Sequence, residues 1–150
     1  MLSYREYQEK DWESICRIHD LARPDELSGS CDPRGFIPIE QDAEVEDLKK
    51  CRKFVACEDQ QIVGFVGVDD DYLAWLYVNP THYGKGVGRE LLRIGLREIG
   101  GDAWTIVLDG NQRAISLYLS EGFQEVRRFA GDNNGYPCTC LRLERKALTS

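Results

Sequence analysis

Three alternating glycines stand between a strand and an amphipathic helix in the middle of this chain. The run reads Leu76-Tyr77-Val78-Asn79-Pro80-Thr81-His82-Tyr83-Gly84-Lys85-Gly86-Val87-Gly88-Arg89. Glycine adopts backbone angles that other residues avoid, and it lets a ligand approach the main chain closely. The helix that follows presents unpaired N–H groups and the positive end of its dipole. The segment therefore predicts a strand-to-helix connection that can hold a phosphate or pyrophosphate group.

A second informative segment runs from Asn111 to Phe123 and reads Asn-Gln-Arg-Ala-Ile-Ser-Leu-Tyr-Leu-Ser-Glu-Gly-Phe. Asn111 closes a predicted strand and can offer its amide to a ligand. Tyr118 follows about two helical turns later, so both side chains can address one ligand. Tyr118 also fits the apolar face of the helix, where it would be a core aromatic residue.

Two nucleotide-binding motifs do not fit the glycine segment. It lacks the spacing of a P-loop, because Val87 follows Gly86 where a Ser or Thr would be needed near Mg²⁺. It also lies in mid-chain, without the strand and helix repeat of a dinucleotide-binding fold before it. A protein that binds the phosphates of another nucleotide is therefore the least favoured alternative.

Hydrophobic periodicity and turn residues predict the remaining elements. Strands are expected over 2–8, 54–57, 62–68, 72–78, 104–108, 123–130 and 138–143, and helices over 12–21, 39–51, 87–99 and 112–121. Asp11 and Asn111 are expected to cap their helices, and residues 24–38 are expected to form a loop. The strand–helix–strand order in the second half implies at least one parallel pairing. The predicted fold class is α/β (α+β) with a mixed central sheet.

Length and charge narrow the function classes. The chain has 150 residues, which predicts a single domain over 1–150. Nineteen Lys and Arg against 26 Asp and Glu give a net charge of −7, which argues against nucleic acid or an anionic membrane as the main partner. No apolar run reaches the ~18 residues of a transmembrane helix, and the first residues lack the apolar stretch of a signal peptide. We expect a cytoplasmic protein.

The cysteine and histidine pattern does not predict a metal site. The six cysteines include no CxxC pair, and His19 and His82 are far apart in the sequence. In a reducing cytoplasm we expect the cysteines to be free thiols.

Taken together, the two segments resemble the GNAT superfamily of acyl-CoA-dependent N-acyltransferases. The family's pyrophosphate loop reads Q/R-x-x-G-x-G/A, and residues 83–88 match it except at Tyr83. Its downstream helix reads N-x-x-A-x-x-F/L/Y-Y-x-x-x-G-F, and the matching positions here are Asn111, Ala114, Leu117, Tyr118, Gly122 and Phe123. The resemblance covers residues 54–143. It implies a mixed sheet of about six to seven strands flanked by about four helices.

The resemblance also implies an activity, a cosubstrate and site residues. The activity is transfer of an acetyl group from acetyl-CoA to a primary amine, by direct attack in a ternary complex. The Val78 N–H would stabilise the oxyanion, and Tyr118 would protonate the departing thiolate. Lys85 and Arg89 would add positive charge to the pyrophosphate loop. The implied coenzyme-binding residues are Leu76, Tyr77, Val78, Tyr83, Gly84, Lys85, Gly86, Val87, Gly88, Arg89, Asn111 and Tyr118.

The reaction also requires a general base, because an alkyl ammonium must lose a proton before it attacks. Some relatives carry a Glu in the strand at the position that is Tyr72 here. The nearest carboxylates form the acidic turn 69–71, and Asp71 is the best single candidate for a base or for attracting the ammonium. A chain of water molecules is an equal alternative.

Three further expectations concern the acceptor, the assembly and the function class. The loop 24–38 and the hairpin tip 131–136 are expected to form the walls of an acceptor pocket. Relatives are often dimers, so the resemblance allows a homodimer. The departures at Tyr72 and Tyr83 keep a second function class open, a non-catalytic domain that binds acyl-CoA as a sensor or scaffold.

Overall fold

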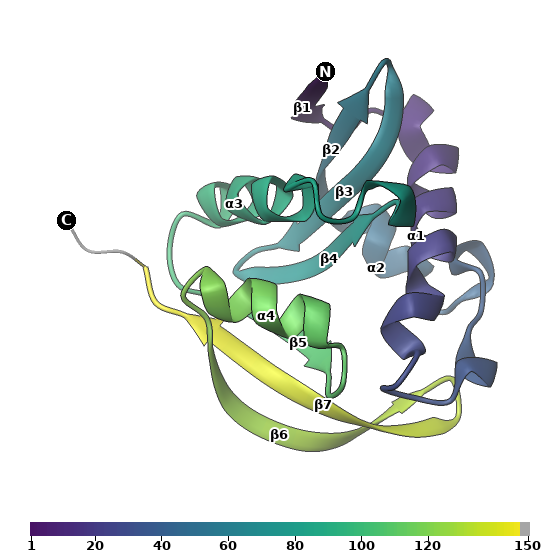
Figure 1. Cartoon of the computed structure of the whole chain (residues 1–150), viewed down its shortest axis with the longest axis vertical. Helices are drawn as coiled ribbons and strands as arrows, with labels where there is room; N and C mark the ends of the chain where they lie inside the picture. Colours follow the sequence, from purple (N-terminus) through teal and green to yellow (C-terminus); the bar gives the residue numbers. More distant parts are fainter. Residues whose placement is uncertain (148–150) are drawn as a thin grey trace.

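A mixed sheet of seven strands forms the centre of the computed structural model, which describes residues 1–147. The strand order is β1-β2-β3-β4-β5-β7-β6, and within the described residues only β4 and β5 pair in parallel (Figure 1). The predicted α/β class with a mixed sheet is therefore confirmed. The last three residues of the predicted domain 1–150 lie outside the described residues.

The element bounds follow the predicted pattern closely in the second half of the chain. The helix predicted over 87–99 spans those same residues, because its apolar positions face the sheet on one side. The strands are β1 (Leu2–Glu6), β2 (Arg52–Glu58), β3 (Gln61–Asp69), β4 (Tyr72–Val78), β5 (Ala103–Leu108), β6 (Gln124–Asn133) and β7 (Tyr136–Arg145). The helices are α1 (Trp12–Leu27), α2 (Val45–Lys50), α3 (Val87–Ile99) and α4 (Gln112–Ser120).

The sheet separates two hydrophobic clusters. Neighbouring residues of one strand belong to different clusters, as Phe65 and Val66 of β3 do, because successive side chains of a strand point to opposite faces. One cluster includes side chains of α3 and α4, which lie in front of the sheet in Figure 1. The other includes side chains of α1 and α2. Helices therefore cover both faces of the sheet.

The two central strands β4 and β5 separate after a single point of pairing. Tyr72 pairs with Trp104, and the Thr105 hydroxyl donates to the Leu73 carbonyl at 2.7 Å. Beyond this point no ladder joins the two strands within the described residues. The fork between β4 and β5 therefore leaves one edge of β4 without a strand partner in the middle of the sheet.

Main-chain groups of β4 point into this fork. The Asn79 N–H donates to the Val63 carbonyl at 2.8 Å, so Asn79 faces β3. Because N–H groups alternate in direction along a strand, those of Leu76 and Val78 point away from β3. Both residues are among those that the family resemblance implies for coenzyme binding.

The first half of the chain departs from the predicted bounds. The helix expected to stop at residue 21 continues to Leu27 and contains Pro24. It continues because Leu27 is fully buried and Arg23 pairs with Glu26 one turn later at 3.0 Å. The second predicted helix, 39–51, is a short 3-10 turn followed by α2. The predicted loop 24–38 therefore begins only after residue 27.

The tip of the β6–β7 hairpin lies against the loop that follows α1, as Figure 1 shows. The Asn133 side chain donates to the Gly35 carbonyl at 3.2 Å and accepts from Arg23 at 2.9 Å. Asn134 also donates to the Gly35 carbonyl, at 2.8 Å. The two segments predicted to wall an acceptor pocket are thus in contact, although Asn133 and Gly35 are 98 residues apart.

Asp11 is the N-cap residue of α1, as predicted, but its side chain makes no cap hydrogen bond and instead stabilises the start of the chain through an ion pair. The carboxylate is 5% exposed and accepts from Arg5 at 2.8 and 2.9 Å and from the Gln8 N–H at 2.8 Å. The hydrogen bond from Arg5 is the main cause that lowers the pKa of Asp11. A lowered pKa contributes stability that is present above the ordinary aspartate pKa and lost as pH falls through the lowered value.

We therefore expect Asp11→Asn to lower the free energy of unfolding by about 1–3 kcal/mol at neutral pH. The variant should also lose less stability than the parent when pH falls below about 4. Urea unfolding at a series of pH values measures both effects. Asp59→Asn is the control, because that side chain is 87% exposed. An Asp11→Asn protein as stable as the parent at neutral pH would contradict the assignment.

None of the helices within residues 1–147 combines the length and the apolar character that crossing a bilayer requires.

Candidate active site

Two cavities meet at the fork between β4 and β5. The glycine-loop cavity has a volume of about 720 Å³ and lies between residues 82–89 and α4. The acidic cavity has a volume of about 560 Å³ and lies between α1, the segment leading into α2, and β5. The residues that line both cavities are Glu26, Leu76, Tyr77 and Ala114. A ligand in one cavity can therefore reach a ligand in the other along β4.

The glycine-loop cavity has an open main-chain wall. Gly84 and Gly86 have φ values of +77° and +82°, and a Cβ at either position would meet nothing within 4 Å. Gly86 is the N-cap of α3, and no side chain caps this helix. The first N–H groups of α3 are thus available to an anion. The chemistry of this wall fits a diphosphate.

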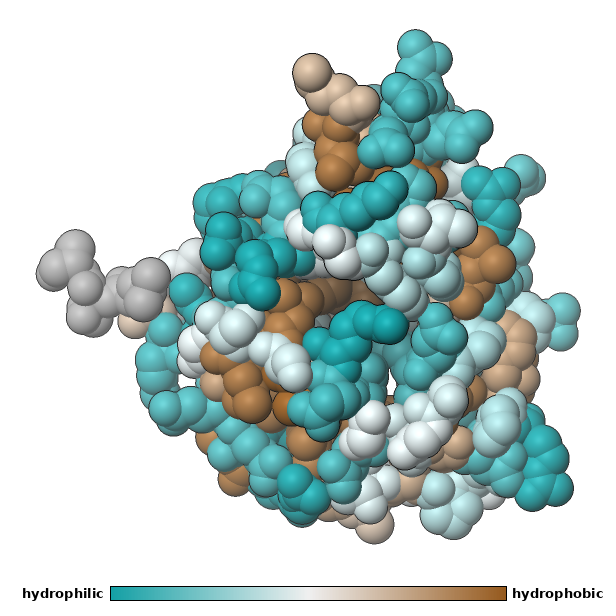
Figure 2. All heavy atoms as spheres, in the orientation of Figure 1, coloured by the Kyte–Doolittle hydropathy of each residue, from teal (hydrophilic) through white to brown (hydrophobic). Residues whose placement is uncertain are grey.

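Figure 2 shows that hydrophilic side chains cover most of the face that carries this cavity, while hydrophobic residues come into view in the hollow between α3 and α4. The apolar part of the lining includes Val87 and Leu117. Gly88 does not have a left-handed backbone; a Cβ there would meet Val78 and Leu117 at 3.6 and 3.7 Å. The cavity thus offers apolar wall beside the polar loop, as a pantetheine arm next to a diphosphate would need.

The cationic groups of this cavity differ from those that the sequence suggested. Lys85 is exposed and does not line it, whereas Arg89 lines it but is paired with Glu121 in a hydrogen-bonded ion pair at 2.6 Å. Arg113 of α4 also lines the cavity, with its guanidinium 3.7 Å from the centre of the Tyr83 ring. The Tyr83 hydroxyl in turn donates to Asp25 at 3.1 Å. Stacked Arg113 therefore brings positive charge to the position where the family pattern has Gln or Arg.

Tyr118 lies at the floor of the acidic cavity. It is 4% exposed, packs edge-on against Phe123 with ring centres 5.1 Å apart, and lies beside Thr105. Burial raises the pKa of Tyr118 well above that of a free phenol, so the hydroxyl keeps its proton at neutral pH. A buried and protonated phenol is a proton donor.

Asn111 lines the glycine-loop cavity, so it and Tyr118 face different cavities. Asn111 is the N-cap residue of α4, as predicted, but its side chain makes no cap hydrogen bond. The Asn111 amide donates to the Glu26 carboxylate at 3.4 Å instead. This contact joins α4 to α1 across the junction of the two cavities.

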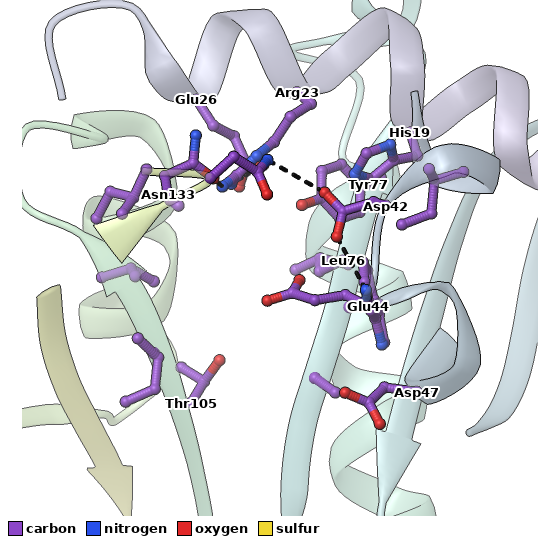
Figure 3. Close-up of a pocket in the computed structure, with 18 of the residues that line it drawn as sticks. His19, Arg23, Glu26, Asp42, Glu44, Asp47, Leu76, Tyr77, Thr105 and Asn133 are labelled. Atoms are coloured by element: carbon purple, nitrogen blue, oxygen red, sulfur yellow. Dashed lines mark hydrogen bonds and ion pairs between the residues drawn. The ribbon is translucent and has the colours of Figure 1, made fainter. Parts of the chain in front are cut away.

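The acidic cavity is dominated by carboxylates. Among the described residues that line it, Arg23 is the one Lys or Arg side chain. Figure 3 shows Asp42, Glu44 and Asp47 on the wall that leads into α2, with Thr105 on the β5 wall opposite. Desolvation in the cavity raises the pKa of Glu44, and repulsion from Asp42 adds to it. The carboxylates that line the cavity are Glu26, Asp42, Glu44, Asp47, Asp69 and Asp132.

Aromatic side chains and a buried histidine complete the lining. The His19 ring lies 4.9 Å from Tyr77 and 6.0 Å from Trp75, measured between ring centres. Burial lowers the pKa of His19, although its hydrogen bond to Asp20 opposes the change. His19 is therefore neutral at neutral pH, and the net charge of the cavity wall stays negative.

Asp71, the base suggested by the sequence, lies elsewhere. It is exposed at the opposite end of β4 from Val78, and its carboxylate accepts from the Trp104 indole at 3.0 Å. It lines neither of the two cavities. The length of β4 separates Asp71 from Val78, although Asp69 of the same turn does line the acidic cavity. We therefore do not assign a role in proton transfer to Asp71.

Glu26 is a site residue that the sequence did not reveal. It was expected in a loop, but it lies on the last turn of α1 and faces both cavities. The signal was present, because Ala22 and Leu27 continue the apolar spacing of α1 beyond residue 21. Pro24 concealed it, since proline usually ends or bends a helix.

The cysteines of the chain are all free, and four of the six are buried. Within residues 1–147, no three His, Cys, Asp or Glu side chains come together as metal ligands would.

Comparison with known proteins shows where this fold and site belong. A sequence model described as an acetyltransferase (GNAT) domain matches residues 49–125. The peptidyl-lysine N-acetyltransferase YjaB of Escherichia coli K12 is 30% identical over 114 residues, which cover 72% of this chain and 77% of YjaB.

Solved structures agree with the sequence comparison. A GCN5-related N-acetyltransferase from Rhodopseudomonas palustris superposes with a TM-score of 0.84 at 17% identity, over 97% of this chain and 95% of the other. The PaiA N-acetyltransferase of Thermoplasma acidophilum, solved in complex with coenzyme A, gives a TM-score of 0.78 at 16% identity, over 98% and 99% of the two chains.

The forked sheet, the glycine loop and these relatives define the class of this protein, which is an acyltransferase. The matched sequence model spans half of the chain, and YjaB is similar over most of both lengths. The chain belongs to the GNAT acetyltransferase family.

Proposed function

We propose that this protein transfers an acetyl group from acetyl-CoA to a primary amine that carries positive charge. Acetyl-CoA binds in the glycine-loop cavity, the amine binds in the acidic cavity, and the amine attacks the thioester directly in a ternary complex. One observation carries the proposal: the two cavities have opposite chemistry and meet on the same residues of β4.

The main chain around α3 binds the coenzyme. The amides of residues 83–89 cradle the diphosphate, as the open space over Gly84 and Gly86 supports. The outward N–H and C=O groups of Leu76 and Val78 pair with the pantetheine arm as another strand would. Asn111 supplies a further hydrogen bond. Acetyl-CoA supplies the activated acetyl group when bound.

Two groups of the protein assist the chemistry at the fork. The Val78 N–H points away from β3 and donates to the oxygen on which negative charge develops. Tyr118 protonates the departing thiolate, because burial keeps its hydroxyl protonated.

The acceptor is a cationic amine. A carboxylate-rich wall attracts an ammonium group and disfavours an anionic one, because like charges repel strongly where water is scarce. The aromatic rings of Trp75 and Tyr77 add surface on which an alkyl ammonium can pack. YjaB acts on peptidyl-lysine by name, and a lysine side chain is one amine of this kind.

A coupled assay tests the proposal. Purified protein is mixed with acetyl-CoA, a thiol reagent and one amine at a time: spermidine, cadaverine, a lysine-containing tripeptide or glutamate. We expect coenzyme A release with at least one of the cationic amines and none above background with glutamate. Calorimetry should detect binding of coenzyme A but not of ATP. Absence of both coenzyme binding and turnover would refute the proposal.

A variant of Arg113 tests the source of positive charge in the coenzyme cavity. We expect Arg113→Ala to weaken coenzyme A binding by about tenfold, since a hydrogen bond to a charged group contributes about 1.5–3 kcal/mol. Calorimetry at two salt concentrations measures the loss and its salt dependence. Arg127→Ala on exposed β6 is the control. Unchanged affinity in Arg113→Ala would assign the phosphate contacts to the main chain alone.

A further inference from the structure

We propose that Glu26 is the general base that takes the proton from the acceptor ammonium. The inference rests on the proposed function and adds the catalytic residue that the family motifs of this chain do not supply. It follows from the position of one carboxylate at the junction of the two cavities.

Glu26 is the acidic residue that lines both cavities in the part of the chain that the structure describes. Asp25 lines only the glycine-loop cavity, and the other carboxylates of the acidic cavity do not reach the glycine-loop cavity. Leu76 and Tyr77 are also shared, so Glu26 faces the stretch of β4 beside which the thioester is placed. A base must lie within hydrogen-bond reach of the attacking nitrogen, and the nitrogen must be at this junction.

Three neighbours hold the Glu26 carboxylate in place. Arg23 donates to one oxygen at 3.0 Å, and Asn111 donates to the other at 3.4 Å. The Tyr77 side chain lies beside the same carboxylate, and burial together with this negative charge raises the pKa of Tyr77 well above its usual range. The side chain of Glu26 is still 26% exposed. It is therefore positioned by its neighbours without being closed off from a ligand.

Other titratable groups at the acidic cavity are less well placed. His19 is 4% exposed, and one ring nitrogen is bonded to Asp20 at 2.9 Å. It lines the acidic cavity alone. Figure 3 shows Glu44 and Asp47 on the α2 side, whereas Glu26 and Arg23 come from α1. These carboxylates can attract the ammonium, but they do not face the coenzyme.

The proton balance of the reaction gives Glu26 a defined step. One ammonium proton passes to the Glu26 carboxylate and then to water in the acidic cavity. The nitrogen lone pair forms the N–C bond, and the C–S bond breaks with its electron pair going to sulfur. Tyr118 gives its proton to that sulfur and is reprotonated by the second proton that the nitrogen loses. The products are an acetamide, coenzyme A as a free thiol, and one proton in solution.

The test compares Glu26→Gln with the parent, using whichever of spermidine, cadaverine and the lysine tripeptide the parent turns over fastest. The amide of this variant has the shape of the carboxylate and keeps one oxygen that can accept from Arg23, so the fold and the cavity should persist. We expect kcat to fall by about 10²-fold, because water and nearby carboxylates can partly replace the base. This is the lower end of the range by which general acid–base catalysis raises a rate. The affinity for coenzyme A should stay close to that of the parent.

A second variant separates a base from a merely structural residue. Glu26→Ala should be as slow as Glu26→Gln, and added formate should restore part of kcat, since a small carboxylate can occupy the space left by the side chain. Glu13→Gln, exposed near the start of α1, is the matched control and should react as the parent does. Formate should not accelerate the parent or the control.

The outcomes distinguish this inference from the proposed function. If the parent binds coenzyme A and acetylates an amine while Glu26→Gln retains the parental kcat, the inference is wrong and the proposed function stands. A slow Glu26→Ala variant that formate does not accelerate would also overturn it. If the parent neither binds coenzyme A nor acetylates any of the amines, the proposed function fails and the inference fails with it.

Discussion

Replacing Tyr118 by phenylalanine is expected to lower kcat by about 10²–10⁴-fold, which is the range for loss of a general acid. The ring of Tyr118 is buried and packs edge-on against Phe123, so phenylalanine fills the same space and only the hydroxyl is lost. Burial raises the pKa of Tyr118, which keeps the proton on the phenol throughout the neutral range. Without this proton the sulfur must leave as a thiolate in a site with little water.

The measurement for Tyr118→Phe is the initial rate of coenzyme A release at saturating acetyl-CoA and amine. Its coenzyme A affinity should be nearly unchanged, because Tyr118 does not line the glycine-loop cavity. Tyr4→Phe on β1 is the control, since Tyr4 is a partly buried tyrosine remote from the fork. A Tyr118→Phe enzyme with parental kcat would show that another group protonates the leaving thiolate.

The second large effect is expected at the main chain of β4. Val78→Pro removes the N–H that points into the fork, and loss of one oxyanion donor lowers kcat by about 10²–10³-fold. The variant should fold, because the ladder to β3 uses the neighbouring Asn79 N–H, and proline is tolerated where a strand has a free edge. Thermal unfolding checks the fold, and the coupled assay measures kcat.

Val78→Ala is the matched control for this variant. It shortens the side chain but retains the N–H, so its kcat should stay near the parental value. If Val78→Ala and Val78→Pro lose the same activity, the side chain and not the N–H explains the effect. If Val78→Pro keeps parental activity while folded, the oxyanion is stabilised elsewhere.

Much of the coenzyme side of the site could be predicted from local sequence. Gly84 and Gly86 adopt left-handed backbone angles that the sequence favours there, and α3 begins and ends where its apolar spacing predicts. How much positive charge Lys85 and Arg89 bring to the coenzyme cavity was less predictable. Arg89 is held by Glu121, which is 32 residues away, and the stacking of Arg113 on Tyr83 joins two separate segments.

The acceptor side could be predicted only in outline. The loop after α1 and the hairpin tip line the acidic cavity through residues such as Phe36 and Asn133, and that this cavity holds the acceptor is our proposal. Of the acidic turn, Asp69 lines the acidic cavity, but Asp71 lies at the end of β4 opposite Val78 and lines neither cavity. Glu26 was missed because Pro24 suggested that α1 had already ended.

The sequence by itself determined the parts that short-range physics controls: the glycine turn, the amphipathic helix behind it, the alternation of β4 and the family to which these motifs belong. Backbone preferences and hydrophobic periodicity act over a few residues, so they can be seen in a linear string. Only the tertiary structure decided which carboxylate lies at the junction of the two cavities. Glu26 contacts Asn111 across 85 residues of chain, and that contact depends on how α1 and α4 pack around the fork of the sheet.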